Sequence, residues 1–147
     1  MKILPLAAVH LEQVWAIETQ AHTHPWAESM IRDLDSRGAC HRVLIDNDRV
    51  LGYFYAQNIV GEVTLLNIVV DPALQGQGLG KQLINGFLDL CEQSQAESAW
   101  LEVRESNVAA YHLYQAVGFN EVDRRRNYYP TVNGKEDAII MSYLFFY

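Results

Sequence analysis

The stretch Gln75-Gly76-Gln77-Gly78-Leu79-Gly80-Lys81 decides the fold of this chain, because it joins a β-like run to an apolar helical stripe. Its three glycines stand at alternate positions, and the first of them follows the strand-stopping pair Asp71-Pro72 after three intervening residues. A glycine backbone lets several N–H groups approach one anion, and the amino end of the following helix adds roughly half a positive charge. The stretch therefore predicts an anion site made of backbone amides, with Lys81 as a nearby cation.

Three alternative structures could contain a glycine stretch of this kind. A Walker phosphate loop requires Ser or Thr where Gln82 stands. A dinucleotide fingerprint requires GxGxxG within a parallel sheet, whereas the glycines here run GxGxG after antiparallel-type strands. Both fit poorly. The third alternative is a tight strand-to-helix turn that binds nothing, and the glycines alone leave it open.

The pattern on both sides of the glycines indicates an α/β chain. Apolar periodicity predicts helices over 8–20, 26–31, 79–95 and 108–117, the last after the capping residues Ser106-Asn107. Alternating and β-branched runs predict strands over 2–4, 41–46, 50–57, 62–70, 99–103, 120–124 and 137–143, with a turn at Asn133-Gly134. We expect the three strands between 41 and 70 to form an antiparallel meander.

Composition limits the classes of protein to consider. The 147 residues, 50% of them hydrophobic, contain no repeat or linker and predict one domain over 1–147. A net charge of -7 argues against nonspecific nucleic-acid binding and suits a basic partner. Cys40 and Cys91 lack zinc or disulfide-scaffold spacing, which indicates reduced thiols. No segment resembles a signal peptide or a membrane span, so we expect a cytoplasmic protein without membrane contact.

The glycine stretch resembles the (Q/R)xxGxG/A acyl-CoA loop of the GCN5-related N-acetyltransferases, the GNAT family. The preceding Asn67-Ile68-Val69-Val70-Asp71-Pro72 is similar to the central strand of that family, whose bulged end splays the sheet. One departure is Gly76, where the family commonly has a bulky basic residue. The resemblance implies a mixed, mostly antiparallel sheet, splayed at an acetyl-CoA cleft and flanked by helices, with acetyl-CoA as cosubstrate.

Within this family the resemblance is strongest to the bacterial ribosomal-protein alanine acetyltransferases. It is carried by blocks along most of the chain: Ala21-His22, Pro25-Trp26, Leu101-Glu102-Val103-Arg104, Ser106-Asn107, Tyr114, Gly118-Phe119, Arg125-Arg126-Asn127-Tyr128-Tyr129-Pro130 and Glu136-Asp137-Ala138-Ile139-Ile140-Met141. It implies direct transfer of acetyl to the N-terminal alanine of the eighteenth small-subunit ribosomal protein, whose basic N-terminal segment would be the partner. The alternatives are a lysine or small-amine acceptor, or a coenzyme A-binding regulator without turnover.

The resemblance also implies the residues that would bind the cosubstrate. Backbone groups of the central strand would hold the pantetheine arm and polarise the thioester carbonyl, and amides of the glycine loop would hold the pyrophosphate. Asn107 would contact the pantetheine arm, although it equally suits a helix cap. The expected cofactor-binding set is Ile68, Val69, Val70, Gln75, Gly76, Gln77, Gly78, Leu79, Gly80, Lys81 and Asn107.

Two residues are expected to carry the chemistry. Alternation along its strand places Glu102 on the face of Trp100 and Arg104, where a Glu is ordinarily solvent-facing. The resemblance makes Glu102 the general base, acting directly or through a water. It makes Tyr114 the general acid toward the coenzyme A sulfur, while its ring can also pack in the core.

The remaining candidate groups concern metals and the acceptor. The histidines, including His22 and His24, lack metal-site spacing, and thioester chemistry needs no metal, so we expect none. Neither cysteine has a motif for nucleophilic catalysis, which disfavours a covalent enzyme intermediate. His22, Trp26, Tyr128 and Tyr129 are candidates for the acceptor side, with packing against loops as the alternative.

Overall fold

One seven-stranded sheet runs through the protein, which we describe from a computed structural model covering residues 1–147. The strand order is β1-β2-β3-β4-β5-β7-β6, and only β4 and β5 are parallel neighbours. The strands are β1 (Lys2–Pro5), β2 (Arg42–Asp46), β3 (Arg49–Ile59), β4 (Glu62–Val70), β5 (Ser98–Arg104), β6 (Asn120–Thr131) and β7 (Gly134–Leu144). The mixed, mostly antiparallel sheet predicted from the sequence is thereby confirmed.

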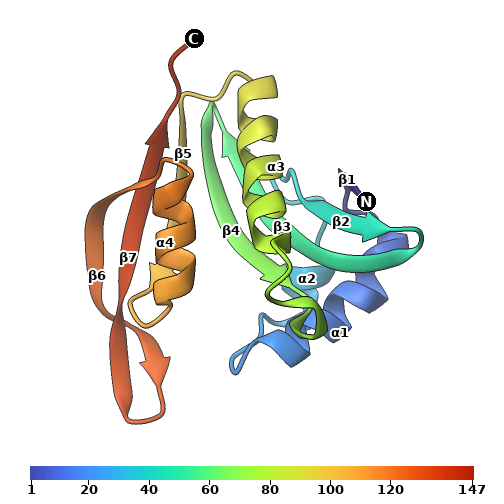
Figure 1. Ribbon diagram of the computed structural model, residues 1–147, viewed down its shortest axis with the longest axis horizontal. Helices are drawn as coiled ribbons and strands as arrows, with labels where there is room; N and C mark the ends of the chain where they lie inside the picture. Colours follow the sequence, from blue (N-terminus) through green and yellow to red (C-terminus); the bar gives the residue numbers. More distant parts are fainter.

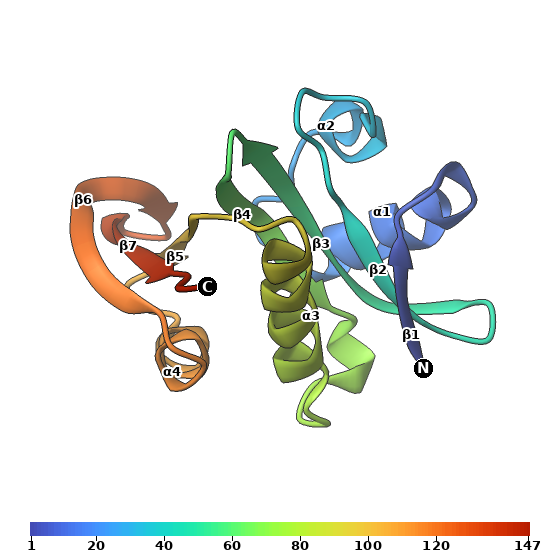
Figure 2. The same cartoon turned by 90° about the horizontal axis from the view of Figure 1, so that it is seen from above.

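Helices cover both faces of this sheet (Figures 1 and 2). They are α1 (Leu11–Ala21), α2 (Glu28–Arg32), α3 (Leu79–Gln93) and α4 (Val108–Ala116), with single 3-10 turns at Ala8–His10 and Pro72–Leu74. The α1 and α2 side chains pack with β2 and β3 in one core cluster. The α3 and α4 side chains pack in a larger cluster on the opposite face. No helix in the chain is both long and apolar enough to cross a membrane.

Helix α3 begins where the glycine stretch ends. Gly78 is its N-cap and adopts a left-handed conformation with φ 78°, which an L side chain rarely takes. The apolar stripe predicted from the sequence is buried, including Leu83, Ile84 and Phe87 at 0% exposure. Full burial of each such side chain contributes about 1.5–3 kcal/mol. This packing fixes the amino end of α3 against the sheet.

A bulge in β4 explains why the sheet opens. Tyr55 pairs with Asn67 and Ala56 pairs with Leu65, so Leu66 is the extra residue in β4. An extra residue bends its strand and increases the local twist. The pairing of β4 with β5 stops at the same place, at Leu65 opposite Leu101. Beyond this point the two strands diverge, and β5 continues beside β7 with α4 packed near it (Figure 1).

Element boundaries differ from the sequence-based ones mainly in the C-terminal third. The predicted strand 120–124 continues to Thr131, because β6 is bulged rather than ended between Arg125 and Tyr129. Asn127, with φ 52°, lies inside this bulge, and its N–H donates to the Asp137 carboxylate at 3.0 Å. The predicted helix over 8–20 begins as a 3-10 turn and becomes α-helical only at Leu11.

Candidate active site

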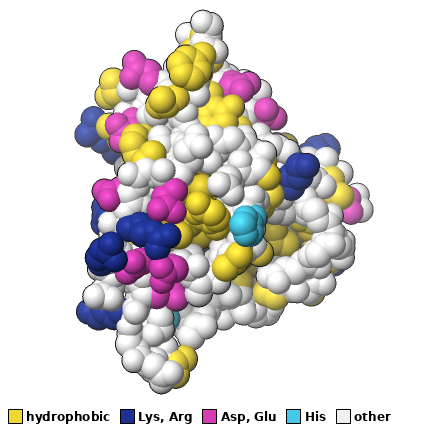
Figure 3. All heavy atoms as spheres, turned by 60° about the vertical axis from the view of Figure 1, so that its left-hand side comes forward, with side chains coloured by type: hydrophobic (Ala, Val, Ile, Leu, Met, Phe, Trp, Pro, Cys, Tyr) yellow, Lys and Arg dark blue, Asp and Glu magenta, His cyan; other side chains and the backbone are white.

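The divergence of β4 and β5 forms a cleft of about 250 Å³. Figure 3 shows the face of the molecule on the β6 and β7 side, where hydrophobic side chains surround a hollow bordered by one histidine and by Arg, Asp and Glu side chains. Four consecutive residues of each strand line the cleft, together with side chains from the α1–α2 segment, α4 and β6. The lining is His22, His24, Trp26, Leu65, Leu66, Asn67, Ile68, Leu101, Glu102, Val103, Arg104, Asn107, Tyr114 and Tyr129.

Glu102 reaches this cleft from β5. Its neighbours Leu101 and Val103 are buried in the core, so strand alternation turns the carboxylate to the other face, as the sequence predicts. The side chain is 30% exposed, and its Oε1 lies 3.2 Å from Nε of Arg125 on β6. A carboxylate at the mouth of an apolar cleft can accept a proton from a bound amine.

Tyr114 borders the same cleft from α4. Its residue is 7% exposed, and its ring lies edge-on near Phe119 with centroids 6.2 Å apart. The chain has no buried side-chain oxygen without a hydrogen-bond partner, and the Tyr114 hydroxyl makes no such bond, so this hydroxyl opens on the cleft. Burial, and secondarily the neighbouring Tyr129, raises the pKa of Tyr114 to about 12. A neutral phenol is therefore available as a proton donor.

Tyr129 on β6 completes this side of the cleft. Burial is the main cause that raises its pKa to about 12, and the negative charge of Glu102 adds to it. The Arg104 guanidinium lies 4.4 Å from the Tyr129 ring centroid and donates to the Pro130 carbonyl at 3.0 Å. These contacts hold the phenol at the mouth of the cleft. His22 and Trp26 border it as well, whereas Tyr128 lies outside the lining, under the Arg125 guanidinium.

The glycine loop offers unpaired backbone donors. None of the N–H groups from Gln75 to Lys81 donates to an acceptor within the chain. Gly76 and Gly78 have φ values of 82° and 78°, and a Cβ added at either would meet no atom within 4 Å. The loop therefore has open space in front of its amides, as an approaching anion requires. The Leu79 side chain is buried in the core, so only its backbone group faces this space.

The cosubstrate candidates on β4 are available through their backbone. Beyond Leu65, one edge of β4 pairs with β3 while the other edge faces the cleft without a strand. The Ile68 side chain lines the cleft, Val69 is buried in the α1 cluster, and Val70 packs on the α3 side. Asn107 lines the cleft, and its side chain also caps α4 by accepting from the Ala110 N–H at 3.2 Å.

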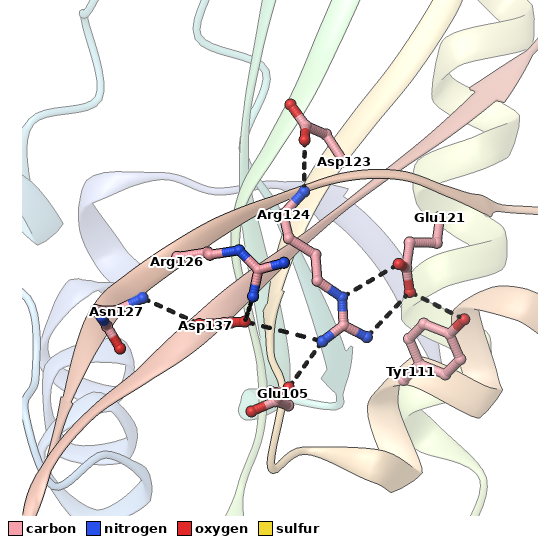
Figure 4. Close-up of polar contacts among 8 residues, drawn as sticks. All are labelled: Glu105, Tyr111, Glu121, Asp123, Arg124, Arg126, Asn127 and Asp137. Atoms are coloured by element: carbon pink, nitrogen blue, oxygen red, sulfur yellow. Dashed lines mark hydrogen bonds and ion pairs between the residues drawn. The ribbon is translucent and has the colours of Figure 1, made fainter.

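An ion-pair network fixes the turn that carries Asn107. The Arg124 guanidinium donates to Glu105 at 2.7 Å and to Glu121 at 3.2 Å, and Asp137 links Arg124 with Arg126 (Figure 4). Glu105 directly follows β5, so the network ties the β5–α4 turn to β6 and β7. Partly exposed pairs of this kind contribute about 0–1 kcal/mol each. Their effect is on the placement of the turn more than on stability.

Sequence reasoning missed two charged residues at this site. Glu18 on α1 is completely buried. The sequence shows only a charged residue next to Ile17 of the apolar stripe, and nothing in that pattern indicates that the carboxylate is buried. Arg125 follows a separate register shift in β6, between Glu121 and Asp123, and pairs with Ala138 of β7, from where its side chain reaches Glu102. No pattern in the sequence locates either contact.

No group of three or more His, Cys, Asp or Glu side chains is arranged to hold a metal ion.

Comparison with known proteins agrees with this geometry. Residues 11–119 match the model of the Acetyltransferase (GNAT) family. The ribosomal protein bS18-alanine N-acetyltransferase of Salmonella typhimurium is 42% identical over 137 residues, which make up 93% of each chain. The protein of the same name from Escherichia coli K12 is 41% identical over 140 residues, 95% of each chain.

A solved structure shows the same arrangement in three dimensions. The crystal structure of the ribosomal-protein-S18-alanine N-acetyltransferase from Escherichia coli superposes with a TM-score of 0.93 at 40% identity. The superposition covers 97% of this chain and 92% of that chain. Strand order, helix placement and the splayed cleft thus belong to one shared fold.

Proposed function

The chain belongs to the GNAT acetyltransferase family, whose members use acetyl-CoA, and we propose that it acetylates the N-terminal alanine of ribosomal protein bS18. The observation that carries this proposal is the convergence of Glu102 from β5 and Tyr114 from α4 on one cleft beside the free edge of β4. Relatives with this name match nearly the full chain. The protein is an acyltransferase that acts by direct transfer in this proposal.

The glycine loop and β4 hold acetyl-CoA in the proposed complex. Unpaired amides from Gln75 to Lys81 face the pyrophosphate, and the amino end of α3 adds a favourable dipole. The free edge of β4 near Ile68, Val69 and Val70 supplies backbone groups for the pantetheine arm, and Asn107 faces it from α4. A backbone N–H of β4 polarises the thioester carbonyl, a role that side-chain replacement leaves intact.

Glu102 prepares the nucleophile. An α-amine is largely protonated near pH 7.5, and only its neutral form attacks a carbonyl. The Glu102 carboxylate takes the proton, directly or through a water, inside the cleft that it lines. Arg125 holds this carboxylate from the β6 side at 3.2 Å.

Tyr114 completes the transfer by donating its hydroxyl proton to the departing thiolate. Its hydroxyl opens on the cleft, and its raised pKa keeps the phenol neutral, so that its proton is available to the thiolate formed beside it. The acetyl group passes from sulfur to nitrogen. The ammonium nitrogen loses two protons: the first goes to Glu102 before attack, and the second leaves as the tetrahedral adduct collapses and restores the proton that Tyr114 gave to the thiolate. No cysteine is needed, and Cys91 is fully buried in the core.

The acceptor enters from the side of the α1–α2 segment and β6. His22, Trp26 and Tyr129 border that entrance, and a small first side chain suits its limited volume. An acidic protein with a net charge of -7 favours a basic segment behind the first residue. A ribosomal acceptor is compatible with the cytoplasmic location that we propose for the reaction.

Replacing Glu102 with Gln tests the base assignment. We expect kcat/KM for an alanine-starting peptide to fall about 10²–10⁴-fold, because the amide cannot accept the amine proton. Stability should change little, since the ion pair with Arg125 is partly exposed. Release of free coenzyme A thiol is the measurement.

Glu62→Gln is the matched control, because Glu62 is an exposed strand glutamate at the start of β4 that lies outside the cleft lining. An unchanged pH–rate profile in the Glu102 variant would show that another group is the base. Uptake of acetyl-CoA without any thiol release by the unaltered protein would instead indicate a binding regulator.

A further inference from the structure

Glu18 is a buried carboxylate that the mechanism above does not use. It lies on the sheet-facing side of α1 at 0% exposure. Its Oε1 accepts from the Tyr53 hydroxyl at 2.7 Å and from Nδ2 of Asn67 at 2.9 Å. Its Oε2 accepts from the backbone N–H of Trp26 at 2.9 Å. A charged group is stable inside a core only when donors of this kind surround it.

Most of the residues that contact this carboxylate also line the active-site cleft. Trp26 and Asn67 both line the active-site cleft, one from the α1–α2 segment and one from β4. A third lining residue, His22, has its Nε2 3.7 Å from Glu18 Oε1. Tyr53 is the exception, since its side chain is fully buried away from the cleft. One carboxylate thus connects the segment at the acceptor entrance to the strand on which the acetyl donor is placed.

The Trp26 contact matters most for the entrance. The segment from His22 to Trp26 has no regular secondary structure, and Pro25 cannot donate a backbone hydrogen bond. The His22 N–H ends α1 by donating to the Glu18 carbonyl at 3.2 Å, and the next backbone N–H of this segment that bonds to the core is that of Trp26, which donates to the Glu18 carboxylate. The Trp26 ring then packs edge-on against Tyr55, with centroids 5.3 Å apart. Glu18 therefore sets where the Trp26 ring stands.

We infer that Glu18 is a positioning residue for the acceptor, which holds Trp26 and Asn67 in the places where the incoming amino terminus contacts them. The inference rests on the proposed function and extends it to a residue outside the cleft. Glu18 touches no substrate. It acts through the two lining residues, so its loss should weaken acceptor binding while leaving the glycine loop and acetyl-CoA binding intact.

Glu18→Gln tests this arrangement with almost no change in shape. A carboxamide has one oxygen and one NH₂ group, whereas donors approach both oxygens of Glu18. With its NH₂ toward Trp26, the Trp26 N–H loses its acceptor. In the opposite orientation, Asn67 loses its acceptor. Either way one lining residue is released.

Steady-state kinetics with each substrate varied in turn is the experiment, using an alanine-starting basic peptide. We expect KM for the peptide to rise at least about tenfold in Glu18→Gln, the effect of losing one hydrogen bond to a buried charge. KM for acetyl-CoA should stay at the value of the unaltered protein. Tyr53→Phe is the matched control, because it removes a donor to the same carboxylate without touching the cleft; its peptide KM should remain unchanged.

Different results would overturn the inference. An unchanged peptide KM in Glu18→Gln, or an equal rise in Tyr53→Phe, would reduce Glu18 to a general core contact. If Glu18→Gln fails to fold by circular dichroism, Glu18→Asp keeps the charge with one methylene less, and its peptide KM must still rise selectively. Failure of the unaltered protein to acetylate the peptide would overturn the proposed function itself, and is visible before any variant is made.

Discussion

Tyr114 combines a ring in the core with a hydroxyl on the cleft, so its chemistry can be removed without removing its packing. In Tyr114→Phe we expect kcat to fall about 10²-fold or more, because the thiolate would leave without a proton donor. The thermal midpoint should hardly change, since the lost hydroxyl makes no hydrogen bond within the chain. Thiol release and a melting curve on the same sample measure both effects.

The raised pKa of Tyr114 fixes the sign of its pH dependence. The neutral phenol is the active form, and a pKa of about 12 keeps it neutral well above the ordinary tyrosine value of about 10. Activity should therefore show no loss from this group as pH rises to about 10. A loss of kcat below that pH that disappears in Tyr114→Phe would contradict the environment described for the hydroxyl.

Some of the residues of the site could be predicted from the sequence, and others could not. Glu102, Asn107 and Tyr114 were expected from the resemblance to known acetyltransferases, and all three lie in the lining of one cleft. Glu18 could not be predicted, because its three donors come from residues 8 to 49 positions away in the chain. The hydrogen bonds of a buried carboxylate are properties of the packed structure, and no local pattern contains them.

The turn between β4 and α3 is the element on which cosubstrate binding depends. In Gly78→Ala, the left-handed φ of 78° costs about 1–2 kcal/mol although the added Cβ meets no neighbour. We expect the backbone to shift and KM for acetyl-CoA to rise, with a lower thermal midpoint. Kinetics at saturating acceptor measure the first effect.

Gly61→Ala provides the comparison for this variant. Gly61 also has a left-handed φ, 84°, and the nearest atom to an added Cβ is an ordinary 3.5 Å away. It lies in the β3–β4 turn, at the other end of β4 from the glycine loop. The two variants should lose similar stability, and equal values of KM for acetyl-CoA in both would argue against an amide-built phosphate site.

Most elements were predictable because their apolar periods are regular. The β2–β3–β4 meander and the α3 stripe were predicted from the sequence and are confirmed. The length of β6 was underestimated because Arg124 to Asn127 lacks strand alternation, and only pairing with β7 carries the strand through the bulge. A bulge in β4 was expected only through the resemblance to the central strand of the family, because its position at Leu66 depends on the register between two strands, which the apolar pattern of β4 does not contain.

At the scale of the whole molecule, the cleft separates two parts of one sheet. The strands β1 to β4 with α1 to α3 lie on one side of it, and β5 to β7 with α4 lie on the other (Figure 1). Both parts contribute to the proposed site: the glycine loop and the α1–α2 side of the acceptor entrance come from one, and Glu102, Tyr114 and the Tyr129 side of the entrance come from the other. Short parallel pairing over Glu62 to Leu65 is what keeps the two halves in register.

Acetylation of an N-terminal α-amine is the central proposal, and one experiment tests it most directly. The protein is incubated with acetyl-CoA and either a basic peptide starting with alanine or the same peptide with a blocked amino terminus but free lysines. Mass spectrometry with fragmentation then locates the acetyl group. We predict acetylation of the α-amine in the first peptide and none in the second. Acetylated lysine side chains in the blocked peptide would contradict the assignment.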